Sequence, residues 1–425
     1  MRSPHPRNLI AGALLALPAA LLAQTPPQQK VSPPEAQGWI DLATYSGFGL
    51  GGIGSLAGAG GGGGGAMAVL GGMLGNATGL NTNRFGNTGS GVAGRWMDVT
   101  LSVRRQPALA DATLAVPQGS GLAPVLKLVS PKAAPTKPSP RVEDDHEVEP
   151  PTMEKPKGKV SLYWGCGDEV RPGQPRTVDF ATALPQDLMQ IFNGRRATQR
   201  GAHSDAGQPL WPSEADSRMV PANATLAGEM AFAGAGVPEN FRFTLPPAQD
   251  LMPPLELQQA QADGAAGATR LSWAALPTAR GYFIAAMGAR KGEESHMVIW
   301  TSSELPDSGF GLVDYQTNTA VDRWEKDKVL LPPAATSCTV PKGVFSGEGA
   351  MLRAIAYGSE LNLAYPPRPT DPKVPWEPDW AVKVRLKSVT TAMLGMDAGG
   401  KRDKPQNEDA KKPSKLDLLR GILGR

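Results

Sequence analysis

Apolar and polar residues alternate in short runs along this chain, and glycine or proline interrupts the runs. The clearest run covers residues 96–104, where Met97, Val99, Leu101 and Val103 alternate with polar residues. A period of two places one set of side chains on one face of a β-strand. The chain holds 50 glycines and 41 prolines in 425 residues, so part of it is expected to lie outside packed strands. The pattern predicts a mainly β protein.

The glycines are concentrated in one stretch. Twenty of the 50 lie between Gly47 and Gly94, and no charged residue occurs in residues 43–83. Glycine disfavours helix by about 1 kcal/mol relative to alanine, so we expect a flexible or collapsed low-complexity segment. A small-residue contact within a membrane or an oligomer is the alternative, because Gly71, Gly75 and Gly79 repeat every fourth residue.

The N-terminus predicts export. Arg2 and Arg7 precede an apolar run from Leu9 to Leu22, and Ala23 follows it. This run is shorter than the roughly 20 residues that span a bilayer, so residues 1–23 are interpreted as a secretory signal peptide, with an uncleaved anchor as the alternative. Composition is typical of a bacterial protein. The expected location is the periplasm, the outer membrane or the cell surface.

Composition shifts divide the rest of the chain. Two β-sandwich-like domains are expected, joined by low-complexity Gly-rich and Pro-rich segments. The predicted segments are 24–94, Pro/Gln-rich and then Gly-rich; 95–129, the first strands of the first β domain; 130–157, a Pro-rich charged linker or loop; 158–248, the remainder of that domain; 249–390, the second β domain; and 391–425, a basic tail.

Seven short strand patterns follow Pro253, which suggests a β-sandwich. Leu271 and Trp273 share one face of a strand, and Tyr282 follows on the next. This region resembles a fibronectin type III or related immunoglobulin-like module, in which such a tryptophan and tyrosine pack in the core. The resemblance implies a scaffold for binding or spacing, with no shared catalytic residues. Near its end, three apolar residues from Val382 alternate with three cations from Lys383, so one face is expected to be buried.

The tail ends in a short amphipathic pattern. Residues 401–425 hold eight basic and four acidic residues. A helix of about ten residues is unstable alone, so it should fold only against its own β domain, another protein or an anionic membrane. The apolar residues of this expected docking helix are Leu416, Leu419, Ile422 and Leu423.

Chemistry-bearing motifs are scarce. Cys166 and Cys338 are the two cysteines, and export would permit a disulfide. Because they fall in separate predicted domains, two buried free thiols are the preferred interpretation. His146, His203 and His296 are far apart in sequence and match no metal-binding spacing. No serine stands in a G-x-S-x-G motif. We therefore expect no catalytic, cofactor-binding or metal-binding residues, and no cofactor.

These observations favour an exported bacterial envelope protein that acts as a non-catalytic structural or binding component, with an unknown protein or envelope partner. A net charge of +3 argues against a nucleic-acid partner. The alternative is a membrane-associated assembly protein that uses the Gly-rich segment and the docking helix. A less favoured third reading is a carbohydrate-active enzyme whose tryptophans line the site: Trp211, Trp300, Trp324, Trp376 and Trp380.

Overall fold

The computed structural model describes residues 29–47, 83–132, 158–184, 194–261, 267–290, 292–345 and 350–394. Strands dominate these ranges, so the prediction of a mainly β protein is confirmed. The described helices are short: α3 (Asn87–Ser90), α5 (Asn318–Lys326) and the 3-10 turns Gln118–Ser120 and Pro247–Gln249. The predicted signal peptide and docking helix lie outside the described residues.

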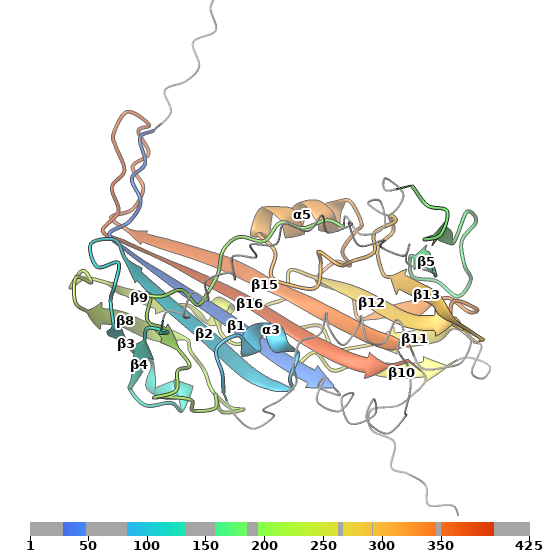
Figure 1. Ribbon diagram of the computed structural model, residues 1–425, viewed down its shortest axis with the longest axis horizontal. Coiled ribbons are helices and arrows are strands. Elements are labelled where there is room, and N and C mark those ends of the chain that lie inside the picture. Colours follow the sequence, from blue (N-terminus) through green and yellow to red (C-terminus); the bar gives the residue numbers. More distant parts are fainter. Residues whose placement is uncertain are drawn as a thin grey trace, which may run out of the picture.

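Most strands belong to one 13-stranded mixed sheet (Figure 1). Its order is β6-β5-β13-β12-β15-β16-β1-β2-β7-β4-β3-β8-β9. The bounds in chain order are β1 (Ala36–Gly47), β2 (Gly94–Val103), β3 (Asp111–Ala115), β4 (Val125–Val129), β5 (Lys159–Trp164), β6 (Arg176–Asp179), β7 (Leu210–Trp211), β8 (Gly228–Gly234), β9 (Arg242–Leu245), β12 (Gly281–Arg290), β13 (Glu293–Thr301), β15 (Met351–Tyr365) and β16 (Trp380–Met393).

A second sheet of three strands has the order β10-β11-β14. These strands are β10 (Gln258–Gln261), β11 (Thr269–Ser272) and β14 (Ser337–Val340). Leu271 and Val340 from this sheet share one apolar cluster with Ile284 and Val384 from the large sheet. Trp273 lies in the same cluster, with its ring centre 5.4 Å from that of Tyr282. Trp273 and Tyr282, which were expected in a core, therefore pack against each other.

The opposite face of the large sheet is also covered. There, α5 contributes Val321 and Trp324 to a second apolar cluster with Ile355 of β15 and Val389 of β16. Figure 1 shows α5 beside the long strand β15. Because both faces are covered, the central strands are buried almost continuously, instead of on every second residue.

The boundary predicted at residue 249 does not interrupt the large sheet. β1, from the N-terminal part of the chain, pairs in parallel with β16, and β5 pairs in parallel with β13. Strands from the N-terminal part therefore flank both sides of the four-strand set β13-β12-β15-β16. The predicted sandwiches share one sheet, which the local strand patterns alone do not reveal.

An arm projects from one end of the sheet (Figure 1). It is formed by residues 29–35 and by the connection between β15 and β16, and Val31 and Trp376 form a parallel bridge within it. The side-chain amide of Gln29 donates to the carbonyl of Val374 at 2.9 Å. The arm is thus ordered by its own hydrogen bonds, although it lies away from the core.

Candidate functional site

Four charged residues lie in register across the centre of the large sheet. Asp98 of β2 is opposite Asp41 of β1, Asp41 is opposite Arg385 of β16, and Arg385 is opposite Glu360 of β15. We call this row the ionic ladder. Asp41, Asp98 and Arg385 are buried. Buried charges are uncommon unless they are paired or functional, so the ladder is the first candidate site.

The centre of the ladder is a two-point ion pair. Arg385 donates from Nε to Asp41 Oδ1 at 2.7 Å and from Nη2 to Oδ2 at 2.5 Å. It also donates to the carbonyl of Gln199 at 2.8 Å and lies 4.3 Å from the ring centre of Tyr315. Burial lowers the pKa of Arg385, but the hydrogen bonds and charge of Asp41 outweigh burial and hold that pKa above its ordinary value. The guanidinium therefore stays charged although it is buried.

A second buried cation lies beside the ladder on β16. Lys387 Nζ donates to Asp314 at 2.7 Å and lies 4.1 Å from the ring centre of Tyr315. Burial raises the pKa of Asp314, but the charge and hydrogen bond of Lys387 outweigh it and lower that pKa to about 2. The Tyr315 hydroxyl donates to the carbonyl of Leu42 at 3.0 Å, and burial holds the pKa of Tyr315 well above its usual value. Tyr315 therefore packs neutral between the two cations.

Residues 194–203 cross this charged face as an extended strap. The Ala202 N–H donates to Asp41 at 3.0 Å, and the His203 N–H donates to the Thr100 hydroxyl at 2.9 Å. A Cβ at Gly201 would overlap the Arg385 guanidinium, so only glycine fits there without a shift. The sheet thus holds the backbone of the strap through buried side chains.

This arrangement leaves the ladder without an open chemical group. Arg385 and Lys387 each have a carboxylate partner, and both are buried beneath the strap or Tyr315. A cation that polarises a substrate must be reachable, and these two are not. The ion pairs that Arg385 and Lys387 make can instead fix which strands meet and in which register, because any other pairing leaves a buried charge alone. The ladder is therefore best explained as a structural clamp.

A second cluster has the order of a hydrolytic triad. Ser161 Oγ lies 2.8 Å from His296 Nε2, and His296 Nδ1 lies 3.2 Å from a Glu293 carboxylate oxygen. A nucleophile, a base and an orienting acid would be placed in this way. However, the Ser161 side chain lies mid-strand in β5 with an exposed fraction of 1%, and its hydroxyl also bonds to Thr177 at 2.8 Å. The cluster therefore joins β6, β5 and β13, and does not present a reachable nucleophile.

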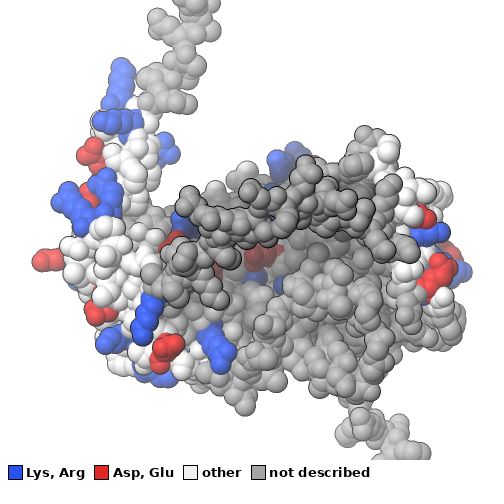
Figure 2. Space-filling model, in the orientation of Figure 1, with Lys and Arg blue, Asp and Glu red and all other residues white. Residues whose placement is uncertain are grey.

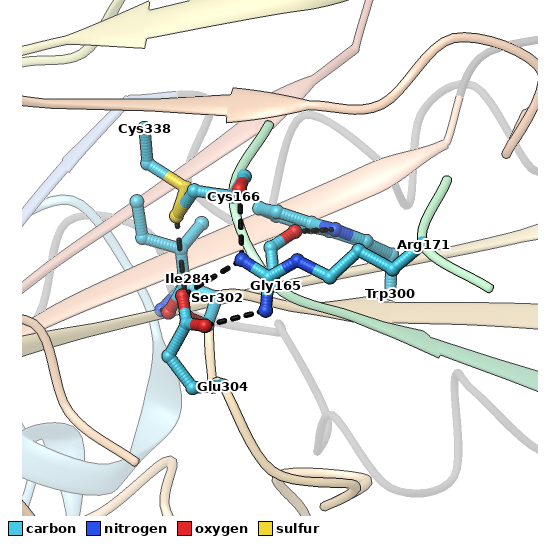
Figure 3. The surroundings of a disulfide bond; sticks show 8 residues. All are labelled: Gly165, Cys166, Arg171, Ile284, Trp300, Ser302, Glu304 and Cys338. Carbon is cyan, nitrogen blue, oxygen red and sulfur yellow. Dashed lines mark hydrogen bonds and ion pairs between the residues drawn. A yellow bond between two sulfur atoms is a disulfide. The ribbon is translucent and has the colours of Figure 1, made fainter. Parts of the chain in front are cut away.

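The two cysteines form a disulfide (Figure 3). Their Cα atoms are 5.3 Å apart, and 172 positions separate them in sequence. The chain leaves β5 at Gly165, which donates to β13, and two residues later Gly167 donates to β14. Cys166 and Cys338 therefore join the large sheet to the small one. This corrects the interpretation of two free thiols, because pairing of β5 with β13 brings Cys166 beside the second sheet.

An ion pair covers the disulfide on one side (Figure 3). Arg171 Nη2 donates to Glu304 at 3.0 Å and to the carbonyl of Cys166 at 3.2 Å. The hydrogen bond and charge of Arg171 hold the pKa of Glu304 below its ordinary value. Trp300 donates from Nε1 to the Gly165 carbonyl at 3.0 Å. These contacts fix the loop that carries Cys166.

The other residues considered from sequence do not gather into a site. Four of the five tryptophans are buried: Trp211, Trp300, Trp324 and Trp380. Trp376 lies on the arm, where the Arg368 guanidinium is 5.5 Å from its ring centre. His203 packs edge-on against Trp39, far along the chain from His296, and His146 lies outside the described residues, as do Leu416, Leu419, Ile422 and Leu423. The four buried tryptophans belong to the apolar clusters of the described residues.

Charge on the face drawn in Figure 2 is mixed. Lysine, arginine, aspartate and glutamate residues are interspersed over the arm and the part of the molecule next to it. Among the described residues on this face, no large surface of one sign is seen. Within the described ranges, no group of three or more His, Cys, Asp or Glu residues is placed to hold a metal ion.

Sequence reasoning missed the ladder and the Ser161–His296 contact. Asp41 was a usable signal, because it is the one charged residue of β1, in a strand that is otherwise uncharged. The helices of the described part include none that is long and apolar enough to cross a membrane. Comparison with known proteins adds no family: no family model matches the chain, and no curated protein or solved structure is significantly similar to it.

Proposed function

We propose that this protein is exported to an oxidising bacterial compartment, the periplasm or the cell surface, and serves there as a non-catalytic structural or binding component. The observation that carries the proposal is the Cys166–Cys338 disulfide. Disulfides persist in exported proteins and are rare in reducing compartments. The signal-peptide pattern of residues 1–23 is an independent argument for the same destination.

A modular scaffold is the second part of the proposal. Residues 249–390 would form a fibronectin type III-like sandwich, with β10-β11-β14 as one sheet and β13-β12-β15-β16 as the other. Support comes from the division of seven consecutive strands into three and four around a shared core. The contact between Trp273 and Tyr282 fits the core that the resemblance implies.

The arm supports a binding role. Val31 and Val374 are nearly half exposed there, and so is Tyr365 at the end of β15, next to the arm; grouped exposed apolar side chains mark interaction surfaces. Prolines at 366, 367, 369, 372, 375 and 378 restrict the connection between β15 and β16. A surface that is ordered before contact loses less entropy on binding. The arm is therefore the part we propose to meet the protein or envelope partner.

One observation favours the alternative of a membrane-associated assembly protein. Gly47 is opposite Thr391, and β1 and β16 run parallel. The charge-free segment that follows Gly47 and the basic tail that follows Leu394 therefore leave the sheet at the same end. A basic tail beside a charge-free segment is a composition that suits an anionic membrane surface.

Fractionation of the full-length chain, expressed with its own N-terminus in a bacterium with two membranes, tests both candidates. We expect release by osmotic shock, an N-terminus that begins after Ala23, and no thiol that a maleimide labels before denaturation and reduction. A cytosolic protein with two reactive thiols would refute export. Retention until detergent is added, with processing and the disulfide intact, would favour the membrane-associated alternative.

A further inference from the structure

Asp98 differs from the other carboxylates of the ionic ladder because no described lysine or arginine forms an ion pair with it. Its side chain is 2% exposed, and its neighbour in register is a second carboxylate, Asp41. Its hydrogen bonds come from the N–H of Gly86 at 3.0 Å and from the N–H and hydroxyl of Thr88, at 3.3 and 2.5 Å. Both donors belong to residues 83–91, which lead the chain into β2.

The environment of Asp98 disfavours its charged form. Burial raises the pKa of Asp98 to about 7, the hydrogen bonds from Thr88 and Gly86 oppose that rise, and the charge of Asp41 adds to it. A protonated carboxyl can still accept from the two N–H groups and can donate to the Thr88 hydroxyl. An ionised carboxylate accepts stronger hydrogen bonds from these donors, but this gain is smaller than the cost of keeping the charge buried beside Asp41.

We propose that ionisation of Asp98 releases residues 83–91 from β2, so that this segment is held closed in acid and opens as the pH rises. Opening admits water to the carboxylate and relieves its repulsion with Asp41. The structure limits the change to this segment, because the donors to Asp98 lie in it. Two further contacts also hold it: the Tyr45 hydroxyl donates to the Thr88 carbonyl at 2.7 Å, and the Asn83 amide donates to the Arg218 carbonyl at 2.7 Å.

The other charged groups on the surrounding elements do not accept the hydrogen bonds by which Gly86 and Thr88 hold residues 83–91 to β2. Arg385 of β16 forms an ion pair with Asp41 of β1, and Lys387 forms one with Asp314. Arg218 forms an ion pair with Asp216. Further titratable groups on these elements are Arg84 in the segment, Arg95 on β2 and His203 in the strap. His203 is joined to β2 through Thr100 and does not bond to Asp98.

Linkage gives the sign and size of the effect. The closed state binds the Asp98 proton more tightly than an open, hydrated state whose carboxyl returns to the ordinary pKa of 3.8. The opening constant should therefore rise about tenfold per pH unit between those two pKa values and level off above pH 7. Between pH 5 and pH 8 this amounts to about a hundredfold.

Hydrogen–deuterium exchange of the intact protein measures this opening. Protection factors of peptides from residues 83–91, corrected for the intrinsic pH dependence of exchange, should fall about a hundredfold from pH 5 to pH 8. In Asp98→Asn, which keeps an oxygen acceptor and cannot ionise, the profile should be flat. The matched control Tyr45→Phe removes a contact to the same segment without removing Asp98, so it should lower protection equally at every pH.

Three results would overturn the proposal. The first is the same pH profile in the parent protein and in Asp98→Asn. The second is opening that spreads with pH through β1 and β2, which would indicate unfolding of the sheet instead of release of one segment. The third is a flat profile in the parent. Thr88→Val gives a second check, because loss of its hydroxyl bond should move the midpoint of the profile to higher pH.

Discussion

Replacing Arg385 with methionine should destabilise this protein far more than loss of an ordinary ion pair. The guanidinium makes two buried bonds to Asp41 and one partly buried bond to the strap. Methionine fills much of the same volume, so the main loss is electrostatic. Asp41 would be left buried without a cation and opposite Asp98. Removing one member of a buried pair typically costs ~3–5 kcal/mol.

The double variant Asp41→Asn/Arg385→Met separates the value of the pair from the penalty for an unpaired charge. Asparagine still offers an oxygen to the Ala202 N–H, which donates to Asp41 at 3.0 Å in the parent. Because neither residue is then charged, most of the loss should be recovered, leaving a deficit of about 1–2 kcal/mol. The strong non-additivity is the signature of two groups that act as a unit.

Urea denaturation followed by far-ultraviolet circular dichroism, with the disulfide intact, measures these free energies. The matched control is Arg104→Met, which removes an exposed pair with Glu35 and should change stability by less than about 1 kcal/mol. The reasoning is wrong if Arg385→Met behaves like this control. It is also wrong if the double variant is no more stable than the Arg385 single variant, because the penalty then does not come from the unpaired Asp41.

Three further changes test the packing around the candidate sites. Gly201→Ala should destabilise by ~1–3 kcal/mol through overlap with the Arg385 guanidinium, and a chemical denaturation curve that superimposes on the parent would contradict this. Trp273→Ala should cost ~3–5 kcal/mol, seen as a lowered thermal midpoint, because the indole lies in the core between the sheets. Replacing both Cys166 and Cys338 with serine should cost ~2–5 kcal/mol, and the same midpoint with and without reductant in the parent would count against a stabilising bridge.

Local pattern predicted the strands well and their surroundings poorly. The alternation at residues 96–104 corresponds to β2, and Trp273 and Tyr282 meet in a core as expected. Near the end of the chain, alternation predicted one buried face, but the structure buries Arg385 and Lys387 on the other face as well. Sequence alternation reports which residues share a face, and it does not report whether a strap or a helix covers the face that carries charge.

Local sequence pattern also failed to predict the helix α5. Residues 302–336 gave no strand pattern, yet Ala320, Val321 and Trp324 have the spacing of one helical face and fill the second apolar cluster. A nine-residue helix is unstable alone, so its formation depends on the sheet beneath it. The contacts with the sheet come from residues far away in sequence, so a stretch of nine residues carries no information about them.

The joining of the two predicted domains also depends on contacts between residues far apart in sequence. In an antiparallel hairpin the partners are close in sequence, so their alternation and their turn appear together. The parallel pairs β1–β16 and β5–β13 have no such turn, and more than a hundred residues separate the partners. What specifies them is chemistry on facing strands: Asp41 meets Arg385 in one pair, and Ser161 meets His296 in the other. Charged and hydrogen-bonding side chains placed in otherwise apolar strands can thus select long-range partners, because a shift in register would leave each of them buried and unpaired. In this chain the residues that resemble a catalytic cluster are better understood as the groups that decide which strands meet.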